Sequence, residues 1–420
     1  MFRGYSLLTA GNLAASVLGF LAVVLIVERF GEQGLGEVTL AISVVGYALI
    51  LGDCGTQLHA VRRVAGAHDE IASTAGTVLS LRLAAGAASY LALLAVASLV
   101  PRLAEIRPLI ALFGLGVLVN VVNASWVPQA LNRSSVLAAS VLGIQLLYVL
   151  GVWRGATGER GLAGVAVAKI GAEGVVAVLL LTWTWKRFGP IRLPPSPRIV
   201  WRLAVDAAPI AGTKLVRGLA LGSDLLIVGL LLSARELGHY AGAVRLFMFL
   251  MSLAGAYFIV LLPRLVRCRA EAGGALAVEI AASLRRVLLP AIGVAGLIAW
   301  LARPLLSHLF APGFGAATVA LRLLLVALLV HLVGRHFRQV LLVSGGQVVD
   351  LRATALAAGV HVALKLFLVP FFGLTGAALG TLVGELTLTS LLWRAARPEL
   401  AVRLPTEEPS AGAGDLDQPR

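Results

Sequence analysis

The chain has 420 residues, of which 59% are hydrophobic and only 13% are charged, with a formal net charge of +14. A soluble globular domain carries about 25% charged residues, because water wets its whole surface. The composition therefore excludes a soluble domain. The basic residues are spread over short connections and form no patch for nucleic acid.

Long apolar stretches recur from Leu7 to Trp393, each long enough to cross a hydrocarbon core about 30 Å thick. In lipid the backbone must satisfy its own hydrogen bonds, so only helices or closed barrels can span. Barrel strands alternate apolar and polar residues, whereas these stretches are apolar on all sides. We predict an all-α polytopic membrane protein with twelve transmembrane helices, at 7–27, 38–58, 75–99, 108–130, 135–154, 161–184, 204–231, 239–262, 286–308, 318–343, 351–370 and 374–394.

The basic residues of the connections are divided unevenly between the two sides of the membrane. Twelve crossings place both termini on one side. The segments on that side carry 19 Lys and Arg, against seven on the other. Because Lys and Arg favour the cytoplasmic side, we expect both termini to be cytoplasmic. We also expect the protein to lie in a bacterial cytoplasmic membrane.

Two segments outside the spans divide the chain. Residues 186–202 contain five basic residues and four prolines, which predicts a stiff, non-helical hinge loop on the cytoplasmic side. This loop would separate an N-terminal six-helix bundle at 1–185 from a C-terminal bundle at 203–396. Residues 397–420 are rich in Pro, Gly and acidic residues, and we expect a disordered cytoplasmic tail there.

Short patterns recur in the two halves. Gly161-Leu162-Ala163-Gly164 opens the sixth span, and Gly373-Leu374-Thr375-Gly376 opens the twelfth. Glu173 and Glu385 follow each pattern at the same spacing. A second pair is Leu35-Gly36-Glu37 after the first span and Leu237-Gly238-His239 after the seventh. The ordered pairs favour a duplication, and two bundles with a site between them are typical of alternating access.

Several of these motifs, in their order, resemble the polysaccharide-biosynthesis flippases of the multidrug/oligosaccharidyl-lipid/polysaccharide exporter superfamily. The resemblance rests on motifs that span nearly the whole chain: Phe30–Gly36, Asp53-Cys54-Gly55, Asp224, Gly238–Ala243, Gln339–Leu342 and Pro370–Ala378. It implies a V-shaped pair of six-helix bundles around a central cavity. It also implies export of undecaprenyl-pyrophosphate-linked sugar repeats. Twelve spans agree with sugar-repeat flippases and differ from the fourteen usual in lipid II flippases.

Basic residues inside the spans are the candidates for binding an anionic headgroup, since ionisable residues in spanning helices are costly and mark functional sites. Lys214 and Arg217 share one face of the seventh span, and Arg335 and Arg338 share one face of the tenth. We predict a cationic cavity wall from these four, with Arg82 of the third span guiding the headgroup inward. Arg82, Arg338 and Lys365 also lie close enough to span ends to reach the membrane surface instead.

Acidic residues inside the spans are the candidates for a coupling ion, which needs a carboxylate of changing occupancy. These are Glu385, Glu173 and Asp224, with His331 and Lys365 as further polar residues of the cavity. Structural roles are the alternatives. Glu173 would pair with Lys169, Glu385 with Lys365, and Asp224 with Arg245 of the next span.

Secondary transport is the function that these features favour. The chain shows no nucleotide-binding loop, no metal-ligand cluster and no external catalytic domain, so we expect no enzyme activity, cofactor or metal. We predict a flippase that carries an anionic lipid-linked oligosaccharide from the cytoplasmic to the external leaflet. Its partners would be that substrate, the phospholipid bilayer, and a polysaccharide polymerase and glycosyltransferases. The alternatives are a drug or metabolite exporter of the same superfamily, whose cationic substrates would favour an acidic cavity, and a membrane polysaccharide polymerase.

Overall fold

The computed structural model describes the chain except residues 1, 67, 156–160, 194–195, 271–274 and 402–420. Within the described residues, the regular structure is entirely helical. The longer helices are α1 (Phe2–Asp53), α3 (Ile71–Leu99), α5 (Arg107–Val121), α7 (Ser134–Gly155), α8 (Gly161–Phe188), α9 (Pro197–Leu231), α10 (Ala234–Ala270), α11 (Ala275–Trp300), α13 (Thr318–Val343) and α14 (Gln347–Leu400). The short ones are α2 (Thr56–Val64), α4 (Pro101–Ala104), α6 (Trp126–Ala130) and α12 (Ala302–Leu309), with 3₁₀ turns at His68–Glu70 and Pro312–Ala317.

Two of the long helices are each a pair of spans joined at a glycine. The chain reverses at Gly31 in α1 and at Gly373 in α14, where φ is +66° and +54°. Only glycine adopts such angles without a steric penalty. With these two divisions, the eight helices of the described residues that are long and apolar enough to span a membrane make ten crossings. The shorter apolar stretches Arg107–Val121 and Gly222–Leu231 lie where the other two are predicted.

Several span boundaries differ from the prediction. The predicted 108–130 span ends at Val121, and the carbonyls of Asn120 and Asn123, on either side of this end, accept hydrogen bonds from Arg82. The predicted 38–58 span ends at Asp53, and the predicted 239–262 span is the longer helix Ala234–Ala270. The predicted 286–308 span begins earlier and ends at Trp300, before the separate helix α12. Helix α9 begins at Pro197, where Ser196 Oγ accepts from the Arg198 amide, so the connector is much shorter than 186–202.

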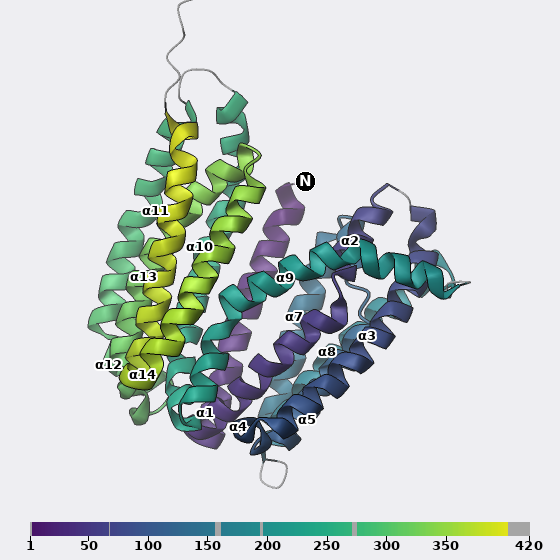
Figure 1. Cartoon of the computed structure of the whole chain (residues 1–420), viewed down its shortest axis with the longest axis horizontal. Coiled ribbons are helices and arrows are strands. Elements are labelled where there is room, and N and C mark those ends of the chain that lie inside the picture. Colours follow the sequence, from purple (N-terminus) through teal and green to yellow (C-terminus); the bar gives the residue numbers. More distant parts are fainter. Residues whose placement is uncertain (1, 67, 156–160, 194–195, 271–274, 402–420) are drawn as a thin grey trace, which may run out of the picture.

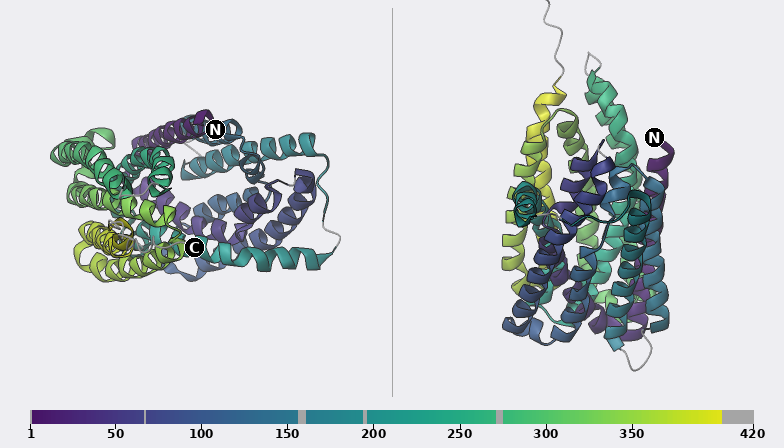
Figure 2. Two further views of the ribbon diagram at one scale, coloured as in Figure 1. Left: turned by 90° about the horizontal axis from the view of Figure 1, so that it is seen from above. Right: turned by 90° about the vertical axis from the view of Figure 1, so that its right-hand side faces the viewer.

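The helices form two bundles that diverge from a common base. The N-terminal half contains α1 to α8, the C-terminal half contains α10 to α14, and together they make a V (Figure 1). The halves meet along α1 and α10. Helix α9 crosses between them: its first part lies against α2 and α3, and its second part packs on α14 (Figures 1 and 2). At the predicted tail, α14 continues to Leu400, and residues 402–420 lie outside the described residues.

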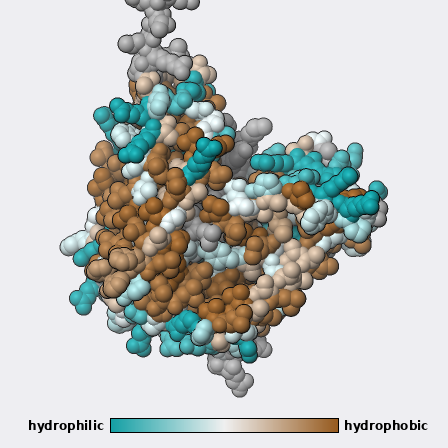
Figure 3. All heavy atoms as spheres, in the orientation of Figure 1, coloured by the Kyte–Doolittle hydropathy of each residue, from teal (hydrophilic) through white to brown (hydrophobic). Residues whose placement is uncertain are grey.

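The outer surface of both arms is apolar. Large side chains such as Leu99, Trp300 and Phe371 are more than 70% exposed. Hydrophilic residues gather at the two ends of the molecule, and the apolar surface lies between them (Figure 3). Apolar exposure on this scale needs lipid to cover it. The chain is therefore a multi-pass membrane protein.

The closed end of the V is held by the pair of repeated motifs noted in the sequence. A Cβ added at Gly36 would lie 1.8 Å from the Ala234 carbonyl oxygen. One added at Gly238 would lie 1.8 Å from the Glu32 carbonyl oxygen. The second helix of α1 and the start of α10 therefore approach each other reciprocally, backbone on backbone. Arg235 and Glu32 add an ion pair at 3.3 Å. We call Glu32–Gly36 and Ala234–Gly238 the apical clasp.

Candidate functional site

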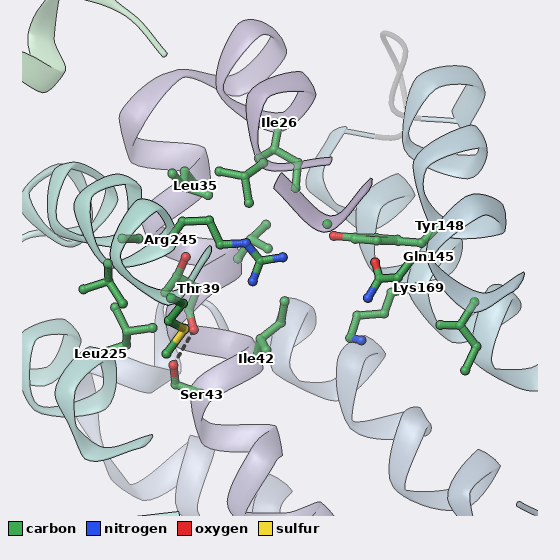
Figure 4. A pocket seen from close by; sticks show the side chains of 17 residues that line it. Ile26, Leu35, Thr39, Ile42, Ser43, Gln145, Tyr148, Lys169, Leu225 and Arg245 are labelled. Atoms are coloured by element: carbon green, nitrogen blue, oxygen red, sulfur yellow. Dashed lines mark hydrogen bonds between the residues drawn. The ribbon is translucent and has the colours of Figure 1, made fainter. Parts of the chain in front are cut away.

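A cavity of about 230 Å³ lies between the two halves. Its lining comes from α1, α7 and α8 of the N-terminal half and from α9 and α10 (Figure 4). Adjoining hollows share its residues. One shares Gln145 and Arg245 and reaches Asn12, and another shares Ser43 and reaches Asp224. The cavity therefore has walls from both bundles, and any change in the angle between them would alter it.

Arg245 is one of two cations that line this cavity, and Lys169 is the other. Arg245 comes from the side of the C-terminal half. Its side chain extends from α10 into the space, facing Gln145, Tyr148 and Lys169 (Figure 4). Gly19 of α1 makes room for it, since a Cβ there would lie 2.4 Å from Arg245 Nη2. Among the described residues no carboxylate pairs with Arg245.

The opposite wall is polar as well. Lys169 Nζ lies 2.6 Å from Glu173 Oε1 and 5.8 Å from the centre of the Tyr148 ring. Gln145 Oε1 is buried, with no hydrogen-bond partner among the described residues. The structural alternative for Glu173, an ion pair with Lys169, is thus present. The cavity as a whole thus offers an anion the Arg245 guanidinium on one side and the neutral side chains of Gln145 and Tyr148 on the other.

Two of the predicted headgroup residues lie elsewhere, in a buried ion cluster of the N-terminal half. Arg82 is 2% exposed and pairs with Asp53. It also donates to Thr56 Oγ1 at 2.7 Å and to the Asn123 carbonyl at 2.8 Å. Lys214 of α9 reaches the other carboxylate oxygen of Asp53 at 2.5 Å. Asp53 therefore pairs with both cations, one at each carboxylate oxygen, and the cluster joins α1, α3 and α9.

The other predicted cations do not form one wall with them. Arg338 pairs with Asp350 at 2.7 Å and donates to Thr354 Oγ1 at 3.0 Å. Arg335 lies over the ring of Phe258, 5.0 Å from its centre. The Arg217 side chain lies outside the described residues, although its backbone is part of α9.

The remaining acidic candidates are paired within the C-terminal half. Glu385 Oε2 lies 3.1 Å from His331 Nδ1. Asp224 is in contact with His361 and Lys365. The alternative pairs Asp224–Arg245 and Glu385–Lys365 are therefore wrong in this structure. Arg245 is the residue that sequence reasoning missed as a cavity cation. Arg245 lies well inside a predicted span, and an ionisable residue at such a position is by itself a signal of a functional site.

A two-bundle membrane protein with a cavity between its halves has the architecture of a secondary transporter. Solved structures share this fold. An inward-facing multidrug resistance MATE family transporter of the MOP superfamily is 19% identical, with a TM-score of 0.74 over 92% of this chain and 94% of that one. The lipid II flippase MurJ in an inward closed conformation is 12% identical, with a TM-score of 0.76 over 93% and 87%. An outward-facing MATE family transporter is 17% identical, with a TM-score of 0.59 over 95% and 98%.

Residues 1–269 match the family model described as polysaccharide biosynthesis protein. The match covers more than half of the chain, so the chain belongs to this family. No curated protein sequence matches it.

Proposed function

We propose that this protein is a flippase that moves an undecaprenyl-pyrophosphate-linked oligosaccharide from the cytoplasmic to the external leaflet of a bacterial inner membrane. The observation that carries the proposal is Arg245, a guanidinium without a carboxylate partner among the described residues, in the cavity between the two halves. A guanidinium can bind a phosphate through two parallel N–H···O hydrogen bonds, and exclusion of water strengthens that contact. Membership of the polysaccharide biosynthesis family supports the lipid-linked sugar as the substrate class.

The open end of the V would face the cytoplasm. Helix α1 begins there, and α8, α10 and α14 end there (Figure 1). The last turns of α8 and α10 are basic, with Lys186 and Arg187 in α8 and Arg267 and Arg269 in α10. The positive-inside tendency supports this orientation. The lipid-linked headgroup would enter between the arms, while the apical clasp closes the external side.

Alternating access would then move the substrate. The headgroup reaches Arg245 from the open, cytoplasmic end. The arms then close on the cytoplasmic side of the headgroup, and the clasp separates to release the headgroup outward. The sugar needs a polar route, which the cavity supplies through Gln145, Ser43 and Lys169. The lipid tail stays in the bilayer beside the arms.

The test is leaflet exposure of a lipid-linked oligosaccharide in vesicles, read with an impermeant glycan-binding probe. We expect protein-dependent exposure that Arg245→Ala reduces at least tenfold, because the main anion-binding group is lost. Arg322→Ala is the matched control: Arg322 is exposed and donates to the Ala299 carbonyl, outside the cavity.

Two results would contradict the proposal. Equal glycan exposure with the wild type and with Arg245→Ala would show that Arg245 does not bind the substrate. No glycan exposure, combined with protein-dependent efflux of small organic cations, would instead favour a multidrug exporter, the other activity found among proteins of this fold.

A further inference from the structure

A second polar cluster lies inside the C-terminal half, centred on Asp224 of α9. Lys365 in the first helix of α14 contacts its carboxylate, and His361 Nε2 lies 2.5 Å from Oδ1. Thr381 in the second helix of α14 donates to Oδ2 at 3.0 Å, and the Tyr240 hydroxyl of α10 donates at 3.3 Å. Lys365 is 0% exposed, so its ammonium has no access to water.

The second helix of α14 is shaped to receive these side chains. A Cβ on Gly380 would lie 2.5 Å from Lys365 Cγ, and one on Gly384 would lie 2.7 Å from His361 Nδ1. Two glycines four residues apart thus face a histidine and a lysine four residues apart. The long aliphatic part of Lys365 fills the space that Gly380 leaves, which directs the ammonium to Asp224.

The Asp224 carboxylate needs a group that compensates its charge. An isolated carboxylate inside a membrane bundle is strongly unfavourable, and it must be protonated, paired or bound to a cation. The oxygens of Asp224, Thr381 and Tyr240 are ligands of the type that alkali cations use in proteins. Here the ammonium of Lys365 occupies the cation position. His331 and Glu385 are a separate pair in the same half, 3.1 Å apart.

We propose that Lys365 is a tethered cation that permanently fills a monovalent-cation site formed by Asp224, Thr381 and Tyr240. The native protein therefore binds no exchangeable sodium there, and this site gives its transport no dependence on sodium. Lys365 determines which ion the site accepts: without it, the site takes a sodium ion. The part of this inference that concerns transport rests on the proposed flippase function. The part that concerns ion binding does not.

Thermal unfolding of the purified full-length protein in detergent tests ion binding directly. Sodium chloride is compared with choline chloride at equal ionic strength. We expect the wild-type Tm to be the same in both salts. Lys365→Ala should have a lower Tm in choline chloride, and sodium should raise it by roughly 2 °C in a saturable manner, as linked binding requires. Asp224→Asn/Lys365→Ala should show no sodium response, because the carboxylate that attracts the ion is gone.

Two outcomes would overturn the inference. One is a saturable sodium response of the wild type that Asp224→Asn abolishes. The other is a Lys365→Ala response no larger than that of the double variant. If Lys365→Ala does not fold, the wild-type and Asp224→Asn measurements still show whether the native protein responds to sodium. Gly380→Ala, which displaces Lys365, is then compared with the double variant in place of Lys365→Ala.

Glycan exposure in vesicles provides the second readout. We expect the wild-type rate to be unchanged when sodium is replaced by choline on both sides. A sodium-dependent rate would overturn the tethered-cation role. Complete absence of glycan exposure would instead contradict the proposed function, and the unfolding data would still report on the ion site.

Discussion

At the scale of single residues, the contacts of the intramembrane charges separate structural from functional roles. Arg82 and Lys214 both pair with Asp53, whereas Arg245 points into a cavity with no carboxylate partner among the described residues. Arg82 directs its donors to Asp53, to Thr56 and to two backbone carbonyls, so its guanidinium is held by protein groups. Arg82 therefore stabilises the N-terminal half, and Arg245 is the group available to substrate.

The Asp53 cluster makes a stability prediction. Asp53→Asn leaves Arg82 buried without its counter-ion, which costs about 3 kcal/mol or more of unfolding free energy, because desolvation of the charge is no longer compensated. Denaturant or thermal unfolding in detergent measures it. The control is Glu70→Gln, which breaks the ion pair with Arg63. Both of those side chains are about half exposed, so the expected loss is under about 1 kcal/mol. Similar losses for the two variants would contradict the structural role of Asp53.

The position of the Arg245 guanidinium makes a second prediction. Gly19→Ala places a methyl group where Arg245 Nη2 now lies, so the guanidinium must shift while its charge remains. We expect glycan exposure to fall severalfold, to a level between wild type and Arg245→Ala. Gly171→Ala in α8 is the control, because a Cβ there meets no other group within 4 Å. An unchanged rate in Gly19→Ala would show that Arg245 acts from another position.

At the scale of helices, α9 is the element that links the two halves. Its Lys214 pairs with Asp53 in the N-terminal half, and its Asp224 pairs with Lys365 in the C-terminal half. The two positions are ten residues apart, or about 15 Å along a helix. A change in the angle between the arms must therefore bend α9 or break one of these pairs. The pair of Lys214 is the less buried one, because the Lys214 side chain is 33% exposed and that of Lys365 is 0% exposed.

The apical clasp is the second element with a testable role. Gly36→Ala would place a Cβ 1.8 Å from the Ala234 carbonyl oxygen, which the helices can relieve only by moving apart. We expect faster hydrogen exchange at the start of α10 and weaker glycan export, since the closed apex loses stability. The same substitution at Gly238 should have the same effect, because the contact is reciprocal. Gly255→Ala in α10, which meets nothing within 4 Å, is the control. Unchanged exchange in both clasp variants would contradict the close approach.

At the scale of the whole molecule, the two pairs of repeated motifs lie at corresponding places in the two halves. Gly161 and Gly373 open the last span of each half, and both have a positive φ, +49° and +54°. The clasp brings a second pair of repeated motifs into mutual contact. Equivalent segments of two related bundles therefore meet at the apex, which is the place where a V-shaped transporter would hinge or open.

Alternating access requires that the clasp separate during transport. Glu32→Cys/Arg235→Cys replaces the 3.3 Å ion pair of the clasp by two thiols, in a chain whose Cys54 and Cys268 are changed to serine. We expect a short bis-methanethiosulfonate bridge to abolish glycan exposure and a reductant to restore it.

The matched control for this bridge is Arg63→Cys/Glu70→Cys, an ion pair within the N-terminal half. A bridge there leaves the angle between the halves free, so export should continue. Undiminished export with the clasp bridged would exclude opening at the apex.

The sequence alone determined the helical architecture, because hydropathy, helix length and glycine conformation are local properties. The long apolar stretches predicted the helical spans, and the repeated motifs drew attention to the glycines at which the chain turns or packs closely. The same local reasoning placed Lys169 beside Glu173, which are four residues apart on one helix.

Only the tertiary structure decided which charges meet. Asp53 pairs with Arg82 across 29 positions and with Lys214 across 161, and Asp224 meets His361 across 137. Such pairs depend on which helix faces turn toward each other, and this is set by packing between helices that no local pattern specifies. Arg245 lies in the cavity for the same reason: Gly19 leaves space for it, and Asp224 is held by Lys365.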